Sequence, residues 1–86
     1  MTQIVDISGQ DWYFELYKTC QKFEKEYGVT PHMYINSDFK QRSVGFFNNV
    51  TWIATEDKMG TNNGLFNGYS FELDDVIEPG VALLKG

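Results

Sequence analysis

Residues 9–28, GQDWYFELYKTCQKFEKEYG, contain the pattern that decides the fold of this chain. At about 100° per residue, one narrow arc collects apolar side chains and the opposite arc collects charges of alternating sign. The pattern predicts one amphipathic helix over residues 9–27. Ser8 and Asp11 form a capping-box-like start, and Gly28 supplies a left-handed stop. The predicted buried arc consists of Trp12, Leu16, Cys20, Phe23 and Tyr27, with Tyr13 at its margin.

Phe14 lies on the charged side of this predicted helix, among lysines. One interpretation is that its ring rests against Lys18, one turn further along. The other is that a second element or a partner covers the ring, which makes Phe14 a candidate binding residue.

After the helix, the apolar period changes from 3.6 to 2, which is typical of half-buried strands. Residues 43–55 are rich in β-branched and aromatic types but are too long for one strand. They predict a hairpin that turns at Asn48-Asn49 and pairs Phe47 with Val50. Both faces of this hairpin carry large apolar groups, and a single helix covers only one of them. Further strands are predicted at residues 4–7, 31–36 and 69–74, with 81–84 as a strand or helical turn.

The 86 residues therefore predict one domain, 1–86, of the α+β class. Its expected architecture is one amphipathic helix packed on a mainly antiparallel sheet of about four to six short strands.

Several classes of protein are excluded by what the sequence lacks. It has no secretory signal and no apolar stretch near the roughly 20 residues that span a bilayer, so we expect a cytoplasmic protein without membrane contact. One histidine and one cysteine cannot build a four-ligand zinc site, and no nucleotide, calcium or nucleophile motif occurs. We therefore expect no cofactor, no metal and no enzyme activity.

A partial nucleic-acid signal stands at residues 42–47, RSVGFF, which echoes the basic and aromatic strand on which RNA bases stack. The glycine after Arg42 and the first aromatic position do not match. The formal charge of −5 also disfavours a polyanionic ligand. Direct nucleic-acid binding is therefore the least favoured alternative.

Two adjacent segments are the candidate binding surface. Residues 56–68 form a long Gly- and Asn-rich stretch that carries apolar side chains, and loops of this length are usually functional or mobile. Residues 72–78 carry four acids and no base, which is either a solubilising charge run or an anionic patch for a basic partner. The candidate partner-binding residues are Phe14, Met59, Leu65, Phe66, Glu72, Asp74, Asp75 and Glu78.

These observations predict a small, acidic, non-catalytic module that binds a protein with a basic surface. Inhibitors of host nucleic-acid-binding proteins from phages or mobile elements, and immunity or antitoxin proteins, have this character by compositional analogy. The alternatives are a self-associating structural protein, in which the two-sided apolar sheet makes a homodimer, and a small nucleic-acid-binding domain.

Overall fold

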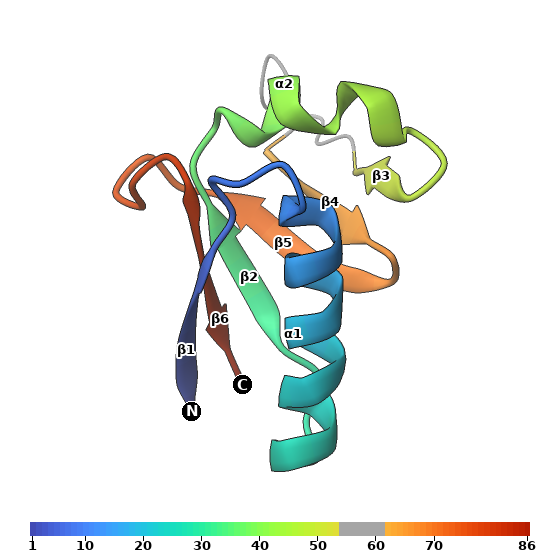
Figure 1. Ribbon diagram of the computed structural model, residues 1–86. Coiled ribbons are helices and arrows are strands. Elements are labelled where there is room, and N and C mark those ends of the chain that lie inside the picture. Colours follow the sequence, from blue (N-terminus) through green and yellow to red (C-terminus); the bar gives the residue numbers. More distant parts are fainter. Residues whose placement is uncertain (54–61) are drawn as a thin grey trace.

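A computed structural model describes residues 1–53 and 62–86 of the chain (Figure 1). In chain order, its elements are β1 (Thr2–Asp6), α1 (Trp12–Tyr27), β2 (His32–Ile35), α2 (Phe39–Arg42), the 3-10 helix η1 (Ser43–Phe46), β3 (Val50–Trp52), β4 (Asn63–Phe66), β5 (Tyr69–Leu73) and β6 (Val81–Lys85).

The strands form one six-stranded sheet in the order β1-β6-β2-β5-β4-β3. Every neighbouring pair is antiparallel except β2 and β5, which are parallel. The strands β1 and β2, joined by α1, run parallel to one another with β6 inserted between them. The mixed α and β class is thus confirmed, but two helices are present where one was predicted.

The predicted amphipathic helix is α1, and the middle of its predicted apolar arc is buried, whereas Tyr27 at the end of that arc is 40% exposed. Leu16, Cys20 and Phe23 are fully buried. Gly28 ends the helix with a φ of 71°, and its N–H donates to the Glu24 carbonyl oxygen. The predicted cap at the start does not form, because the Ser8 hydroxyl donates to the Asp6 carboxylate instead.

The hairpin predicted at Asn48-Asn49 is wrong, because residues 39–46 are helical. The physical reason is a helical period that begins at Phe39, before the stretch 43–55, whose β-branched and aromatic composition conceals it. Phe39, Ser43 and Phe46 recur at helical spacing, and all three turn inward or partly inward. The Phe46 ring stacks on Tyr13 with centroids 4.7 Å apart, which fixes η1 against α1. Phe47, predicted to pair with Val50, is 78% exposed.

The strand β4 lies where the sequence predicts a loop. Asn67 and Gly68 both have positive φ, 49° and 88°, as a two-residue type I′ turn requires. This turn joins β4 to β5 in a hairpin with Phe66 opposite Tyr69. Asn67 is also bound to α1, because its side-chain N–H donates to the Tyr13 hydroxyl at 2.9 Å.

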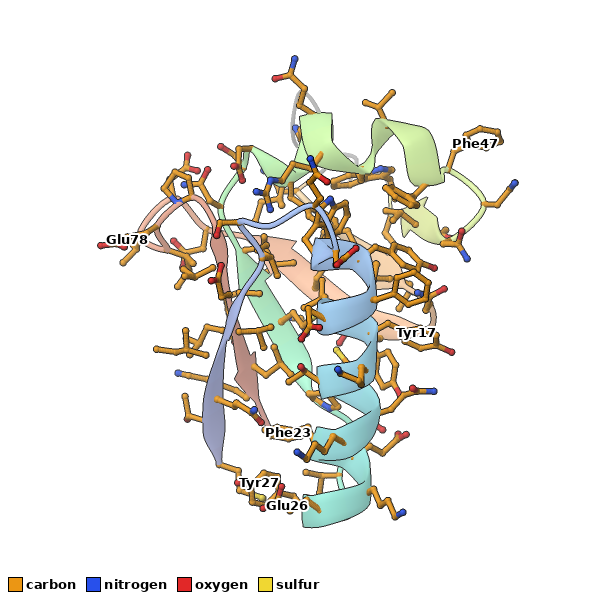
Figure 2. All side chains as sticks on the ribbon, in the orientation of Figure 1. Tyr17, Phe23, Glu26, Tyr27, Phe47 and Glu78 are labelled. Carbon is orange, nitrogen blue, oxygen red and sulfur yellow. The ribbon has the colours of Figure 1, made fainter. Side chains whose placement is uncertain are left out.

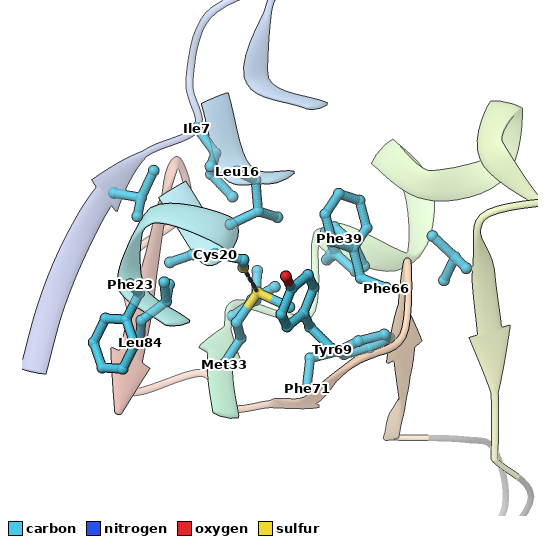
Figure 3. Packing of buried hydrophobic residues seen from close by; sticks show 14 residues of the cluster. Ile7, Leu16, Cys20, Phe23, Met33, Phe39, Phe66, Tyr69, Phe71 and Leu84 are labelled. Atoms are coloured by element: carbon cyan, nitrogen blue, oxygen red, sulfur yellow. Dashed lines mark hydrogen bonds between the residues drawn. The ribbon is translucent and has the colours of Figure 1, made fainter. Parts of the chain in front are cut away.

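The hydrophobic core lies entirely between α1, α2 and one face of the sheet (Figure 3). Along each strand, alternate residues point into it, such as Val5 on β1, Met33 on β2 and Phe71 on β5. The side chains between them therefore project from the opposite face. No helix among the described residues covers that opposite face, which we call the open face.

Candidate protein-binding surface

The open face combines apolar and polar side chains in separate regions. Near the β1 edge, Ile4 lies opposite Leu83, and Leu83 lies opposite Tyr34. Ile4 is 69% exposed, which is unusual for a large aliphatic residue in a strand. Because α1 packs on the other face, these residues form an apolar part of the described sheet that no described helix covers.

A groove of about 450 Å³ lies at this end of the open face. Its floor comes from β1 and β6, and its wall comes from the segment that joins β5 to β6, residues 74–80, which we call the acidic loop. Val76 at the crest of this loop is 87% exposed. Figure 2 shows Glu78 at the tip of the same loop, projecting away from α1. The residues that line the groove are Ile4, Val76, Ile77, Glu78, Val81, Ala82 and Leu83.

The acidic loop is held in place by hydrogen bonds at both of its ends. The Asp74 N–H donates to the Ile35 carbonyl oxygen at 2.8 Å, and the Asn36 side-chain amide donates to the Ile77 carbonyl oxygen at 2.9 Å. At the other end, Gly80 has a φ of 90°, and its carbonyl oxygen accepts the Ile7 N–H at 2.8 Å. The groove wall is therefore preorganised, which reduces the entropy that a partner must overcome on binding.

The four acids predicted to form an anionic patch have different roles in the structure. Asp74 accepts the Val76 N–H at 2.9 Å and so shapes the loop. Asp75 accepts the Ser37 N–H at 3.1 Å, and hydrogen bonding to Ser37 lowers the pKa of Asp75. Glu72 binds the His32 imidazole at 3.0 Å. Glu78 lines the groove itself, so it is the acid best placed to meet a basic group of a partner.

The apolar anchors predicted from the sequence lie elsewhere. Phe66 is fully buried between Tyr13, Tyr17 and Phe39, so it belongs to the core and is not available to a partner. Leu65, on the same strand, projects from the open face and is 37% exposed. Met59 lies outside the described residues.

Phe14 is 72% exposed on α1, which covers the opposite face of the sheet from the groove. Its ring meets the edge of Tyr13 at 6.0 Å rather than Lys18. Phe14 and the acidic loop therefore do not belong to one surface.

The structure also assembles a polar cluster that the sequence did not reveal. His32 on β2 lies between Ser70 and Glu72 on β5, with its Nδ1 2.7 Å from the Ser70 hydroxyl and its Nε2 3.0 Å from Glu72. An ionised carboxylate accepts only, so Nε2 carries the proton in neutral His32 and Nδ1 accepts the Ser70 O–H. The alternation in residues 69–74 places Ser70 and Glu72 on one face, but the parallel pairing of β2 with β5 has no short-range signal.

This cluster resembles the acid, base and hydroxyl set of a nucleophilic site, but it lies on a flat sheet. Such catalysis needs N–H groups aimed at a developing oxyanion. Both β2 and β5 are flanked by strands on each side, so their N–H groups are engaged in the sheet ladder. The cluster satisfies both ring nitrogens of a half-buried histidine.

Comparison with known proteins found no match among protein-family models, curated proteins or solved structures. Within residues 1–53 and 62–86, no helix has both the length and the apolar character needed to cross a membrane. The same residues hold no group of three or more His, Cys, Asp or Glu side chains arranged to bind a metal ion.

Proposed function

We propose that this chain is a non-catalytic protein-binding module that uses the groove on its open face to bind a protein with a basic surface. The observation that carries the proposal is the position of Val76. A rigid, acidic loop holds this aliphatic side chain 87% exposed beside an apolar groove. Nothing in the core requires that arrangement.

The groove suits a partner that presents both apolar and basic side chains. Its floor and wall are apolar, with Ile4, Val81 and Leu83 below and Val76 and Ile77 above. Interfaces concentrate their binding energy in a few such buried contacts. The acids at the rim then attract a basic partner and govern its rate of association, because electrostatic complementarity acts mainly on encounter.

The absence of catalysis belongs to the same proposal, and the sheet geometry around His32 supports it. Neighbouring strands engage the backbone N–H groups of β2 and β5 around the polar cluster, so these groups are not available as oxyanion donors. An inhibitor of a host nucleic-acid-binding protein, or an immunity or antitoxin protein, matches the small size and the formal charge of −5.

Two exposed valines provide the test. The tagged chain captures its partner from the native host, and the purified pair is then measured by binding kinetics. Val76→Ser should weaken binding by more than about 1 kcal/mol, chiefly through faster dissociation. The matched control is Val44→Ser, because Val44 is 70% exposed on η1 and does not line the groove.

The role of the acids at the rim of the groove is tested with the same purified pair of proteins, through Glu78. Glu78→Gln should slow association and flatten its dependence on salt, while the dissociation rate changes little. Normal binding by both Val76→Ser and Glu78→Gln would contradict the proposal, since a partner that contacts neither residue does not use the groove.

A further inference from the structure

We propose that β1 is the pairing strand of a symmetric homodimer, in which two copies of this chain join β1 to β1 in antiparallel orientation about Ile4. The inference goes beyond the proposed function, because it rests on the outward backbone groups of the sheet edge, which shares only the Ile4 side chain with the groove.

The first observation is the direction of the backbone groups of β1. The Met1 carbonyl oxygen accepts the Gly86 N–H at 3.1 Å, and the Ile7 N–H donates to the Gly80 carbonyl oxygen at 2.8 Å. Odd-numbered residues of β1 therefore bond to β6. Because bonding alternates along an antiparallel pair, the N–H and C=O groups of Thr2, Ile4 and Asp6 point away from the sheet.

The second observation is that β1 lacks most of the features that usually protect an edge strand, since its one charge is Asp6 at its end. Lysine, proline, bulges and very short strands all discourage pairing with another chain. The sequence of β1, TQIVD, has none of the first two, and its register with β6 is continuous over all five residues. The opposite edge of the sheet, β3, is only three residues long.

The third observation is that β1 complements itself when it is turned end for end about Ile4. Ile4 then meets Ile4 on the open face, and Thr2 meets Asp6. On the helix face, Gln3 meets Val5. No two like charges are opposed, and Thr2 lies beside Lys85 in the sheet, so Asp6 of one copy approaches a basic residue of the other. A foreign strand would need to match this pattern, whereas a second copy does so by symmetry.

This pairing makes one sheet from both copies, with both α1 helices on the same side. The two-fold axis runs through the paired Ile4 residues, so the apolar regions around Ile4 and Leu83 merge across it. Each copy retains its own acidic loop, which makes the dimer bivalent for a partner.

Sedimentation velocity over a wide concentration range tests the dimer with the full chain. We expect a reversible monomer–dimer equilibrium. Thr2→Pro removes one outward N–H without touching the groove, and proline is tolerated where an edge N–H faces solvent. This variant should weaken dimerisation by about tenfold or more while its far-UV circular dichroism and melting remain close to those of the native chain.

Hydrogen exchange provides a second, residue-level measurement that does not depend on a variant. Protection of the Thr2, Ile4 and Asp6 amides should rise with protein concentration, whereas that of Gln3 and Val5 is set by β6. Val76→Ser, in the groove, should still dimerise. A chain that stays monomeric at all concentrations would overturn the proposal. So would a dimer that survives Thr2→Pro but is lost in Val76→Ser, because that result assigns self-association to the groove.

Discussion

The Sγ atom of Cys20 lies 3.5 Å from the Sδ atom of Met33, and this contact joins the middle of α1 to β2 (Figure 3). Both residues are fully buried. The thiol donates to the thioether, so the lone cysteine is a packing residue at the centre of the helix–sheet interface. Its burial has a chemical consequence that can be measured.

Cys20 should be unreactive toward thiol reagents in the native chain at neutral pH. Burial raises the pKa of Cys20 to about 12, so almost no thiolate is present. The same shift makes stability depend on pH. The unfolded thiol ionises near pH 9 while the folded thiol keeps its proton, so the unfolded state binds fewer protons and stability falls as pH rises above that value. Reaction with a chromogenic disulfide, with and without denaturant, and denaturant melts at several alkaline pH values provide the measurements.

Cys20→Ala is the control for the alkaline melts, since it should lose part of this pH dependence, with Tyr69 supplying the remainder. Burial also raises the pKa of Tyr69 to about 12. Rapid modification of Cys20 under native conditions would show that α1 opens readily.

Leu16→Ala should lower the free energy of unfolding by about 2–5 kcal/mol, because it removes a fully buried side chain from α1 and leaves a cavity. Lys22→Ala, on the exposed arc of the same helix, should change stability by no more than about 0.5 kcal/mol. Urea melts of the two variants measure the difference. Equal losses would contradict the assignment of the buried arc.

Phe66→Ala should destabilise the chain by about 3–5 kcal/mol, because its ring fills the space between Tyr13, Tyr17 and Phe39. Leu65→Ala is the matched variant on the same strand. Its side chain projects from the open face, so the expected loss is about 1 kcal/mol or less. Thermal melts distinguish the two. A stable Phe66→Ala variant with impaired partner binding would show instead that Phe66 belongs to the binding surface.

Gly64→Ala should destabilise the pairing of β3 with β4 by about 1–3 kcal/mol. A Cβ atom at this position would lie 2.1 Å from the Thr51 carbonyl oxygen, which is backbone and cannot rotate aside. Gly45→Ala is the control, because a Cβ atom there meets nothing within 4 Å. Denaturant melts, together with the fluorescence of Trp52 on β3, report the outcome. An unchanged free energy of unfolding for Gly64→Ala would contradict this prediction, because it would show that β3 moves away from the new Cβ atom without loss of stability.

The parts of the fold that could be predicted depend on short-range pattern. The arc of α1 and its stop at Gly28 follow from periodicity and from the left-handed conformation that glycine permits. The Asn67-Gly68 turn also has a short-range signal, but it lies inside the Gly- and Asn-rich stretch 56–68, which as a whole predicts a loop. Gly64 is needed in the strand for close approach to Thr51, so its presence marks packing rather than a turn.

The rest of the fold depends on contacts between residues that are far apart in the sequence. Phe46 occurs in the stretch 43–55 with strand-like composition, and the packing of Phe39 and Phe46 against Trp12 makes the helical period decisive. For the candidate binding surface, too, one part can be predicted from the sequence and the other cannot. Charge alone predicts the acids of residues 72–78, whereas Ile4, which lines the groove with Glu78, lies at the other end of the sequence.

The insertion of β6 between β1 and β2 has a consequence for the order in which the chain can fold. On a ribosome, β1, α1 and β2 emerge before β6, yet β1 pairs only with β6, so it has no strand to pair with until residues 81–85 are synthesised. During that interval, Leu16 and Phe23 have no complete sheet to pack against. The strand β1 is therefore made before β6 but paired only after it, and in the interval it is exposed to chaperones and proteases.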